Sequence, residues 1–341
     1  MNINLISDTF TIPSRDMLDA MLNAEVGDDV FKEDPTLNRL EDKVAKMFGK
    51  ESGLFFPSGT MSNQVAIKIH TKPGDQLICD ELSHIYHYEG GGVSFNSGVS
   101  CRLVKGINGL INKDQVDEAI NPSNFYHSPP TSLVSIENTS NKGGGSCYEL
   151  DSLKSISKLC KKRKISTHLD GARIWNAMVA TNTNADQYGR LFDTISVCFS
   201  KGLGCPVGSM LLSSKELNKE AVRYRKVLGG GMRQVGYIAA AADYAIDNNI
   251  KDLINDHKKA KELESILNDI EYVDKVEPVS TNIIIFSLKS IYNEDKFIEL
   301  LSNNNIRLIK LGRGKIRIVT HRDYTQNQHE FTINILKNLK F

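Results

Sequence analysis

The sequence predicts an α/β fold in which a large unit, built on a mostly parallel sheet, precedes a smaller C-terminal α/β unit. From Gly53 to about Ser213, short apolar runs alternate with helical patterns, and Gly, Pro, Asn or Asp bounds each pair. Few of these runs alternate with polar residues, which is typical of strands buried on both faces of a parallel sheet. At 341 residues, the chain is also longer than one compact domain usually is.

The elements of the large unit follow from this pattern in order. We expect a helix over Leu37–Phe48, where apolar residues recur at helical spacing after Asp34 and Pro35. Seven runs then predict the strands of the sheet, which are Gly53–Phe56, Gln76–Cys79, Val99–Val104, Ser132–Glu137, Lys164–Leu169, Thr194–Phe199 and Gly208–Leu212. Helices between these strands should cover both faces of the sheet.

A helix of small residues around Ala239–Ala242 is expected to lead into the second unit. There the pattern predicts a helix over about Asp256–Leu267, a strand over Asn282–Leu288, a helix over Glu294–Asn303, further strands and a final helix. We place the boundary near residues 245–255. Residues 1–250, with an N-terminal arm, then form the large domain and residues 251–341 the small one.

Composition excludes several classes of partner. The 42 Lys and Arg residues nearly balance the 41 Asp and Glu residues, so no overall field attracts nucleic acid or an anionic membrane. The six cysteines contain no C-x-x-C pair, which indicates reduced thiols and neither zinc ligands nor disulfides. The N-terminus lacks a basic segment followed by an apolar one. We therefore expect a soluble cytoplasmic protein without a metal site.

Lys201 is a candidate catalytic residue, because it directly follows an apolar strand and precedes the glycine-rich turn Gly202-Leu-Gly204. Burial disfavours the ammonium form of a lysine, and a neutral amine can form a Schiff base. Most loop lysines are solvated instead, so both interpretations stay open here. The glycines do not predict a dinucleotide site, because Gly208–Leu212 continues as a strand and no helix begins there.

Two further segments suit a cofactor with a pyridine ring and a phosphate. Asp170 lies at the C-terminal end of a predicted strand, where a carboxylate can keep a pyridine nitrogen protonated. Ser58-Gly59-Thr60 leads into a helix expected to begin near Met61, and the N–H groups at such a helix start attract phosphate. Each segment also has an ordinary interpretation, because Asp-Gly caps turns and Ser-Gly-Thr describes an empty helix cap.

Several segments together resemble the threonine aldolases, which are pyridoxal-phosphate enzymes of fold type I in the aspartate-aminotransferase superfamily. The resemblance spans nearly the whole chain. Its segments are Ser58-Gly-Thr-Met-Ser-Asn63, His84-Ile-x-x-Tyr-Glu-Gly-Gly91, Glu137-Asn-Thr139, His168-Leu-Asp-Gly-Ala-Arg173, Ser200-Lys-Gly202, Pro206-Val-Gly-Ser209, Gly229-Gly-Gly-Met-Arg-Gln234 and Arg317-Ile-Val-Thr-His321. It implies an aldolase that cleaves L-threonine or L-allo-threonine to glycine and acetaldehyde with pyridoxal 5'-phosphate.

The resemblance also implies a role for each matching residue. Lys201 would form the Schiff base, Asp170 would face the ring nitrogen, His84 would stack on the ring, and Ser58, Gly59 and Thr60 would hold the phosphate. Ser7, Arg173 and Arg317 would hold the substrate carboxylate or cofactor oxygens. His127 would lie near the substrate hydroxyl, with Glu89 behind it, although a loop histidine is usually only solvated and Glu89 suits a helix end equally well.

The resemblance further places Lys226 and Arg233 near the phosphate of a neighbouring subunit, which implies a homodimer or a homotetramer built as a dimer of dimers. The base that accepts the β-hydroxyl proton stays open among His84, His127 and a water between them. Phe31 and Lys32 replace a Tyr-Gly pair that is common in the family, Ser140 a frequent histidine, and Pro130 a frequent arginine. The first of these departures removes a phenol near the rim of the active site, which puts substrate preference in question more than reaction type. A β-eliminating lyase, an amino-acid racemase and a non-catalytic cofactor-binding protein are the alternatives.

Overall fold

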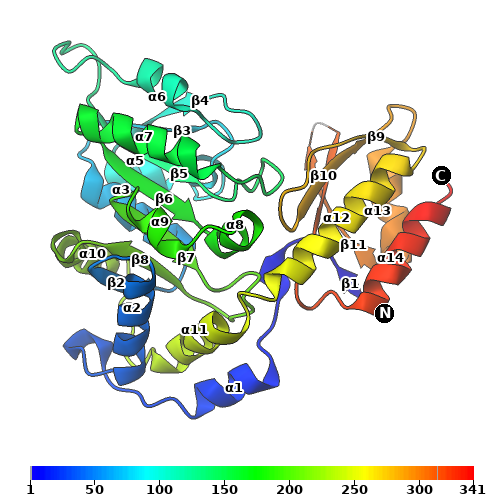
Figure 1. The fold of residues 1–341 in the computed structure, drawn as a ribbon, viewed down its shortest axis with the longest axis horizontal. Helices are drawn as coiled ribbons and strands as arrows, with labels where there is room; N and C mark the ends of the chain where they lie inside the picture. Colours follow the sequence, from blue (N-terminus) through cyan, green and yellow to red (C-terminus); the bar gives the residue numbers. More distant parts are fainter. Residues whose placement is uncertain (1, 313) are drawn as a thin grey trace.

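A seven-stranded sheet forms the centre of the larger body in this computed structural model, which describes residues 2–312 and 314–341 (Figure 1). Its strand order is β2-β8-β7-β6-β5-β3-β4. The strands are β2 (Ser52–Phe56), β3 (Gln76–Asp80), β4 (Ser100–Val104), β5 (Thr131–Glu137), β6 (Ser166–Gly171), β7 (Thr194–Cys198) and β8 (Ser209–Ser213). Only β8 runs antiparallel to its neighbours, so the prediction of a mostly parallel sheet of the type I fold is confirmed.

The predicted strands are all present, with small shifts at their ends. The largest shift is at β6, which was expected to begin at Lys164 and begins at Ser166. Lys164 has a φ of 58° and terminates the preceding helix in the left-handed conformation, so it cannot start a strand. Sequence periodicity identifies the strand itself, but the conformation of the residue before it sets the boundary.

Helices cover both faces of this sheet (Figure 1). They are α1 (Arg15–Leu22), α2 (Pro35–Met47), α3 (Gly59–His70), α4 (His84–His87), α5 (Gly92–Ser97), α6 (Lys113–Ala119), α7 (Leu150–Arg163), α8 (Ile174–Thr181), α9 (Ala185–Gly189), α10 (Lys215–Val227) and α11 (Gly236–Asn248). The Asp34 side chain caps α2 by accepting a hydrogen bond from Leu37 N, and Pro35 occupies the first turn, as the sequence predicts.

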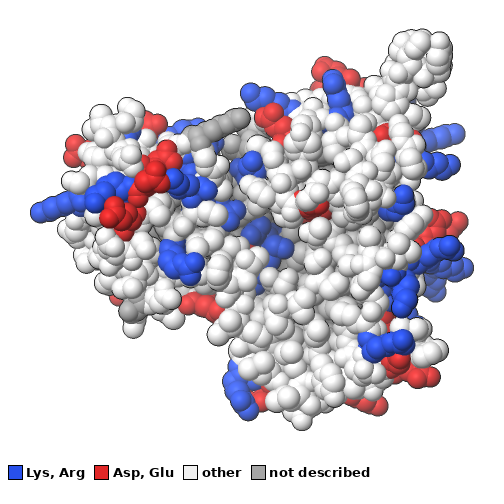
Figure 2. Space-filling model, turned by 180° about the vertical axis from the view of Figure 1, so that it is seen from behind, with Lys and Arg blue, Asp and Glu red and all other residues white. Residues whose placement is uncertain are grey.

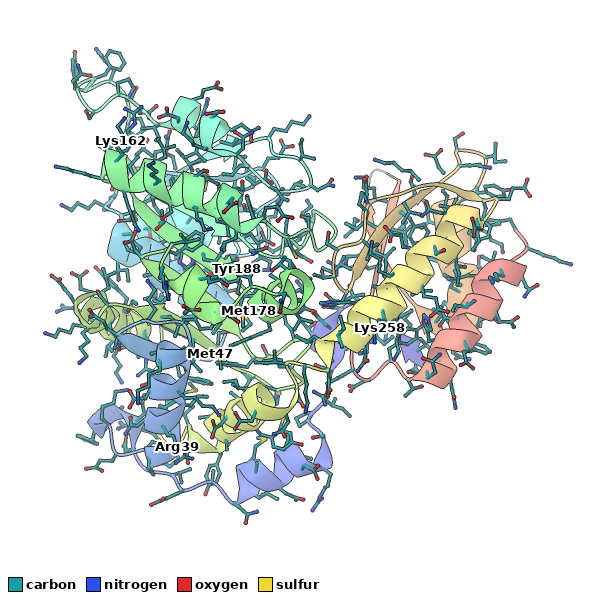
Figure 3. All side chains as sticks on the ribbon, viewed as in Figure 1. Arg39, Met47, Lys162, Met178, Tyr188 and Lys258 are labelled. Atoms are coloured by element: carbon teal, nitrogen blue, oxygen red, sulfur yellow. The ribbon has the colours of Figure 1, made fainter. Side chains whose placement is uncertain are left out.

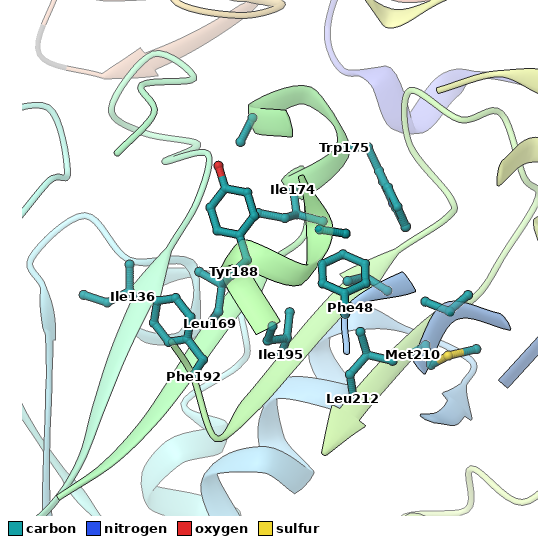
Figure 4. Packing of buried hydrophobic residues seen from close by; sticks show 14 of the residues in the cluster. Phe48, Ile136, Leu169, Ile174, Trp175, Tyr188, Phe192, Ile195, Met210 and Leu212 are labelled. Atoms are coloured by element: carbon teal, nitrogen blue, oxygen red, sulfur yellow. The ribbon is translucent and has the colours of Figure 1, made fainter. Parts of the chain in front are cut away.

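The larger hydrophobic core lies on the α2, α8 and α9 face of the sheet. Phe48, Trp175 and Tyr188 pack there against strand residues such as Ile195 and Met210 (Figure 4). Phe48 and Trp175 meet edge to face at 5.7 Å. The labelled Lys162 of α7 and Lys258 of the C-terminal body are exposed, so the polar faces of their helices meet solvent (Figure 3). No helix in the described ranges is long and apolar enough to span a membrane.

The smaller body contains a four-stranded antiparallel sheet in the order β12-β13-β10-β9. Its elements are α12 (Leu253–Asp269), β9 (Val273–Val276), β10 (Ile283–Leu288), α13 (Glu294–Asn303), β11 (Ile306–Arg307), β12 (Ile309–Gly312), β13 (Lys315–Val319) and α14 (Gln326–Asn338). The N-terminal strand β1 (Ile3–Asn4) pairs in parallel with β11, and Ile3 and Leu5 join the core of this body. We propose that the boundary between the two domains lies between residues 250 and 251. The N-terminal arm then belongs to the large domain in sequence, although its first residues pack against the smaller body.

The surface is hollowed where the two bodies meet, on the side opposite to that of Figure 1. Basic side chains lie within this hollow (Figure 2). The C-terminal ends of β5, β6 and β7 open toward it, and ligands bind at these ends in open α/β sheets.

Candidate active site

A cavity of about 300 Å³ at this edge of the sheet brings most of the predicted site residues together. The predicted residues that line it are Ser7, Ser58, Gly59, Thr60, His84, Glu89, Asp170, Arg173, Lys201 and Arg317. They come from the N-terminal arm, from segments of the larger body between residues 58 and 201, and from β13 of the smaller body. The fold therefore unites segments that are up to 310 positions apart, between Ser7 and Arg317.

Lys201 lies in the loop after β7, and hydrogen bonds from several directions hold this loop. The Lys201 carbonyl accepts from Thr11 Oγ1 at 2.8 Å. The Leu203 carbonyl accepts from Asn249 Nδ2 at 2.7 Å and from Arg322 Nη1 at 3.2 Å. The half-buried Lys201 side chain lines the cavity, and its amine has no hydrogen-bond partner among the described residues. The backbone is thus fixed while the amine stays available to a ligand.

Asp170 ends β6 and uses its two oxygens differently. Oδ1 accepts a hydrogen bond from Ala172 N at 3.1 Å, which is the turn-capping role, whereas Oδ2 accepts from Asn63 Nδ2 at 2.9 Å. Asn63 Nδ2 also donates to Glu89 Oε1 at 2.9 Å. The two interpretations of Asp170 are therefore compatible, because one oxygen caps the turn and the carboxylate still lines the cavity.

His84 completes this polar cluster from the start of α4. Its Nδ1 lies 3.0 Å from Glu89 Oε1, and atoms of His84, Glu89 and Asp170 lie within 4.8 Å of one another. Burial alone would lower the pKa of His84, but the hydrogen bond to Glu89 and the charges of Asp170 and Glu137 outweigh it and raise the pKa. Because Nδ1 faces a carboxylate, Nδ1 carries the proton and Nε2 is the free nitrogen of the neutral ring.

Glu137, at the end of β5, holds two backbone segments at the rim of the cavity. Its carboxylate accepts from His84 N at 2.7 Å and from Asn141 N at 2.8 Å. Burial and the neighbouring Asp170 charge raise the pKa of Glu137 to about 7. The buried carboxyl groups Asp170, Glu89 and Glu137 thus converge, and the positively charged ring nitrogen of a pyridine suits their negative potential.

The N-terminus of α3 also lines the cavity. Ser58 Oγ accepts from Met61 N at 3.2 Å and caps the helix, which begins at Gly59, two residues before the predicted start at Met61. A Cβ at Gly59 would lie 2.6 Å from Cys198 Sγ, so only glycine lets the helix approach β7 this closely. Ser58, Gly59 and Thr60 line the cavity, and the N–H groups at such a helix start attract anions such as a phosphate.

Two buried arginines lie near each other at the smaller body's side of the cavity. Arg173 donates from Nε and Nη2 to both oxygens of Asp8, at 2.8 and 2.7 Å. Although burial opposes its charge, Asp8 raises the pKa of Arg173. Arg317 instead donates to neutral oxygens only, Asn141 Oδ1 at 2.9 Å and the Ile6 carbonyl at 3.0 Å, and its Nε has no described partner.

This difference assigns the arginines different electrostatic roles. Burial and the nearby Arg173 charge lower the pKa of Arg317, which a bound anion would reverse. Arg173 is already neutralised by Asp8. Arg317 is therefore the arginine that an anionic ligand would stabilise more. A carboxylate matches the geometry of its planar guanidinium group.

Three predicted site residues lie outside this cavity within the chain. His127 is exposed on the loop between α6 and β5, which projects from the larger body (Figure 1). Lys226 is exposed near the end of α10, and Arg233 pairs with Asp28 at 2.9 Å. Lys226 and Arg233 were predicted to act in a neighbouring subunit's site, whereas His127 was predicted near the substrate hydroxyl and does not line the cavity of its own chain.

Asn63, Glu137, Asn141 and Asp8 line or brace the cavity, although none of them was predicted as a site residue. A spacing argument could have found Asn63, because it lies one helical turn after Gly59. No local pattern predicts Asp8, since its partner Arg173 follows 165 positions later.

Comparisons with known proteins agree with this geometry. A family model described as "Beta-eliminating lyase" matches residues 4–290. "Low-specificity L-threonine aldolase 1" of Arabidopsis thaliana is 39% identical, and the alignment covers 98% of this chain and 95% of that protein. "Low specificity L-threonine aldolase" of Escherichia coli (strain K12) is 37% identical, with 96% of each chain covered. The solved structure of a Leishmania major threonine aldolase superimposes with a TM-score of 0.85 at 21% identity, covers 99% of each chain and supports the fold.

Proposed function

Since the chain belongs to the beta-eliminating lyase family, and to the threonine aldolases within it, we propose that it cleaves L-threonine or L-allo-threonine to glycine and acetaldehyde. The reaction is a retro-aldol cleavage of the Cα–Cβ bond, which makes the protein a carbon–carbon lyase. The observation that carries the proposal is the single cavity that contains the Lys201 amine, the Asp170 carboxylate and the Arg317 guanidinium. An amino-acid substrate with a β-hydroxyl is expected to bind there.

The residues of the cavity fit pyridoxal 5'-phosphate. The first turn of α3, with Ser58, Gly59 and Thr60, would hold the phosphate, and Asp170 would face the ring nitrogen. His84 would stack on the ring, and Lys201 would provide the amine that attaches the cofactor. When bound, the cofactor supplies a ring that accepts the electron pair released by bond cleavage.

The chain's own groups then orient the substrate and move its protons. Arg317 holds the substrate carboxylate, while the Asp8–Arg173 pair braces the wall beside it, so the Cα–Cβ bond keeps one orientation. The β-hydroxyl proton passes to His84, to His127 of a neighbouring copy or to a water between them. His84 is the candidate that lines the cavity in this chain, with Nε2 free to accept a proton.

We also propose an oligomer with shared sites, either a homodimer or a homotetramer. Lys226, Arg233 and His127 lie outside the cavity of their own chain, which supports their action in a neighbouring site. The N-terminal segment before α2 exposes large apolar side chains, and so does α10; these include Phe10, Ile12, Leu22, Phe31 and Val227. Such exposed side chains favour burial against a second copy.

A cytoplasmic location stays part of the proposal. All six cysteines, Cys79, Cys101, Cys147, Cys160, Cys198 and Cys205, are free thiols in the structure. Reduced cysteines are typical of a reducing compartment.

The second candidate activity is β-elimination, because the matching family model has that description. Both reactions would use Lys201 and Asp170, so product analysis must separate them. L-Threonine incubated with the cofactor-loaded enzyme should yield glycine and acetaldehyde in equal amounts. Release of 2-oxobutanoate and ammonia without acetaldehyde would support the elimination instead, and a racemised substrate with neither product would support a racemase.

A further inference from the structure

A chain of buried hydrogen bonds runs from Asp170 away from the cavity. Asn63 Oδ1 lies 3.1 Å from His168 Nε2, and His168 Nδ1 lies 2.9 Å from Thr194 Oγ1. Thr194 Oγ1 in turn lies 3.0 Å from His70 Nε2, near the end of α3. We call Asn63, His168, Thr194 and His70 the Asp170 relay. Apart from Asn63, its members do not line the cavity.

The relay follows from the sheet and the helix that covers it. His168 and Asp170 are two residues apart on β6 and therefore point to the same face. Thr194 lies directly opposite His168 on β7. Asn63 and His70, both on α3, meet this face from above. The fold thus stacks polar groups directly behind the Asp170 carboxylate.

Each hydrogen bond of the Asp170 relay is donated in the direction of Asp170. Burial lowers the pKa of His168 to about 3, helped by the nearby His70, and burial lowers the pKa of His70 to about 4. Both rings are therefore neutral near pH 7, with one N–H each. Because Asn63 Nδ2 donates to Asp170 and Glu89, Asn63 Oδ1 must accept from His168 Nε2–H. His168 Nδ1 then accepts from the Thr194 hydroxyl, which accepts from His70.

We propose that His168 and Asn63 are positioning residues that keep the Asp170 carboxylate aimed at the ring nitrogen of the bound cofactor. This inference rests on the proposed function. Asp170 and Glu89 are close carboxylates that share one amide donor, so without Asn63 held in place they would repel each other. His168 prevents Asn63 from turning, because a flipped amide would set its NH2 group against the His168 N–H.

The relay should therefore influence the proton on the ring nitrogen. A displaced Asp170 carboxylate would stabilise a protonated ring nitrogen less well. The visible absorbance of the cofactor-loaded protein should then titrate at higher pH. The other titratable groups around Asp170 are unchanged in relay variants; they are His84, Glu89, Glu137, Arg173 and Lys201.

The experiment compares relay variants as cofactor-loaded holoenzymes. His168→Phe keeps a ring but removes both hydrogen bonds, His168→Gln restores a donor for Asn63, and Thr194→Val removes the hydroxyl without changing the shape. Thr332→Val is the matched control, because Thr332 is a buried threonine of α14 in the smaller body, where its hydroxyl donates to the Gln328 carbonyl. The readouts are the pH titration of the visible absorbance, the Kd for pyridoxal phosphate, kcat, KM and Tm.

We expect His168→Phe to move the absorbance titration up by about half a pH unit or more and to lower kcat about ten-fold, with KM changed less than about three-fold. Thr194→Val should shift the titration in the same direction by less, and His168→Gln should recover most of the wild-type value. Thr332→Val should change Tm alone.

Variants that lower Tm but leave the titration and kcat at wild-type values would overturn the inference, because the relay would then be only structural. If His168→Phe does not fold, Thr194→Val and His168→Gln decide the question in the same way. A wild-type protein that binds no pyridoxal phosphate and releases no acetaldehyde would instead contradict the proposed function, so the two failures are distinguishable.

Discussion

Arg317 is the residue whose environment most clearly favours binding of a substrate carboxylate. It is buried, its described partners are neutral oxygens, and its Nε has no described partner. An arginine on a strand is usually solvated and contributes within about 0.5 kcal/mol on truncation. A charge-assisted fork to the substrate is worth about 2–5 kcal/mol.

We therefore expect Arg317→Ala to lower kcat/KM for threonine roughly thirty-fold or more. Arg317→Lys should recover little, because lysine cannot reproduce the two-point geometry. Visible cofactor absorbance should stay unchanged in both variants. Lys315→Ala is the control on the same strand, since Lys315 is exposed and pairs with Glu277. Wild-type kcat/KM in Arg317→Ala, or a defect confined to cofactor binding, would refute the carboxylate assignment.

Asp170 allows a second test at the residue scale. Asp170→Asn keeps an oxygen that can cap the turn at Ala172, but it removes the charge that faces the cavity. We expect the fold to survive and kcat to fall by more than about two decades, because a neutral amide cannot keep the ring nitrogen protonated. Steady-state kinetics and circular dichroism measure both effects. Near-normal kcat would mean that Asp170 serves only as a turn cap.

At the scale of elements, the N-terminal arm joins the two bodies through a buried ion pair. Asp8 pairs with Arg173 at the start of α8 and accepts from Asn282 Nδ2 at 3.2 Å, just before β10. Burial alone would raise the pKa of Asp8, but Arg173 lowers it from the ordinary 3.8 to about 2. Because the folded-state value is the lower one, the pair stabilises the fold above about pH 4.

That contribution, about 2 kcal/mol, should be lost as the pH falls from about 4 to about 2. Urea unfolding of purified protein across this range measures it. Over this pH range, the free energy of unfolding of Asp8→Asn should change less than that of the wild type, and the difference should equal this contribution. Asp269→Asn, at an exposed carboxyl group, should behave as wild type. An unchanged pH dependence in Asp8→Asn would show that the pair does not couple folding to protons.

Local patterns predict the elements better than they predict the site. The strands and α13 appear where periodicity places them, because burial on both faces leaves continuous apolar runs. The β1–β11 pairing and the Asp8–Arg173 contact join segments far apart in sequence, and no local pattern encodes them. Asn63 was missed for a related reason, since its importance depends on its contact with Asp170, which lies 107 positions later on β6.

At the scale of the whole molecule, we propose that the predicted site residues outside the cavity act in the site of a second copy. In a mixture of Lys201→Ala and Arg233→Ala subunits, one site of each mixed pair would combine an intact Lys201 with an intact Arg233 from the neighbour. Mixing the two weakly active variants under subunit exchange should therefore restore activity above the sum of both. Sedimentation velocity should show a dimer or larger particle.

If Arg233 acts within its own chain, every mixed site lacks one of the two groups and mixing restores nothing. A fully active monomer on dilution would likewise contradict shared sites. A mixture of Lys201→Ala with Lys315→Ala subunits controls for simple dilution of an active chain.

The central claim is that the Lys201 cavity is the catalytic centre, and borohydride reduction of the active holoenzyme tests it most directly. Reduction fixes the cofactor to the amine that holds it, and mass spectrometry of the digested protein locates the label. We predict that the label lies on Lys201, and that the reduced enzyme, like Lys201→Ala, no longer releases acetaldehyde from L-threonine. A label on another lysine, or a Lys201→Ala variant with full activity, would contradict the account.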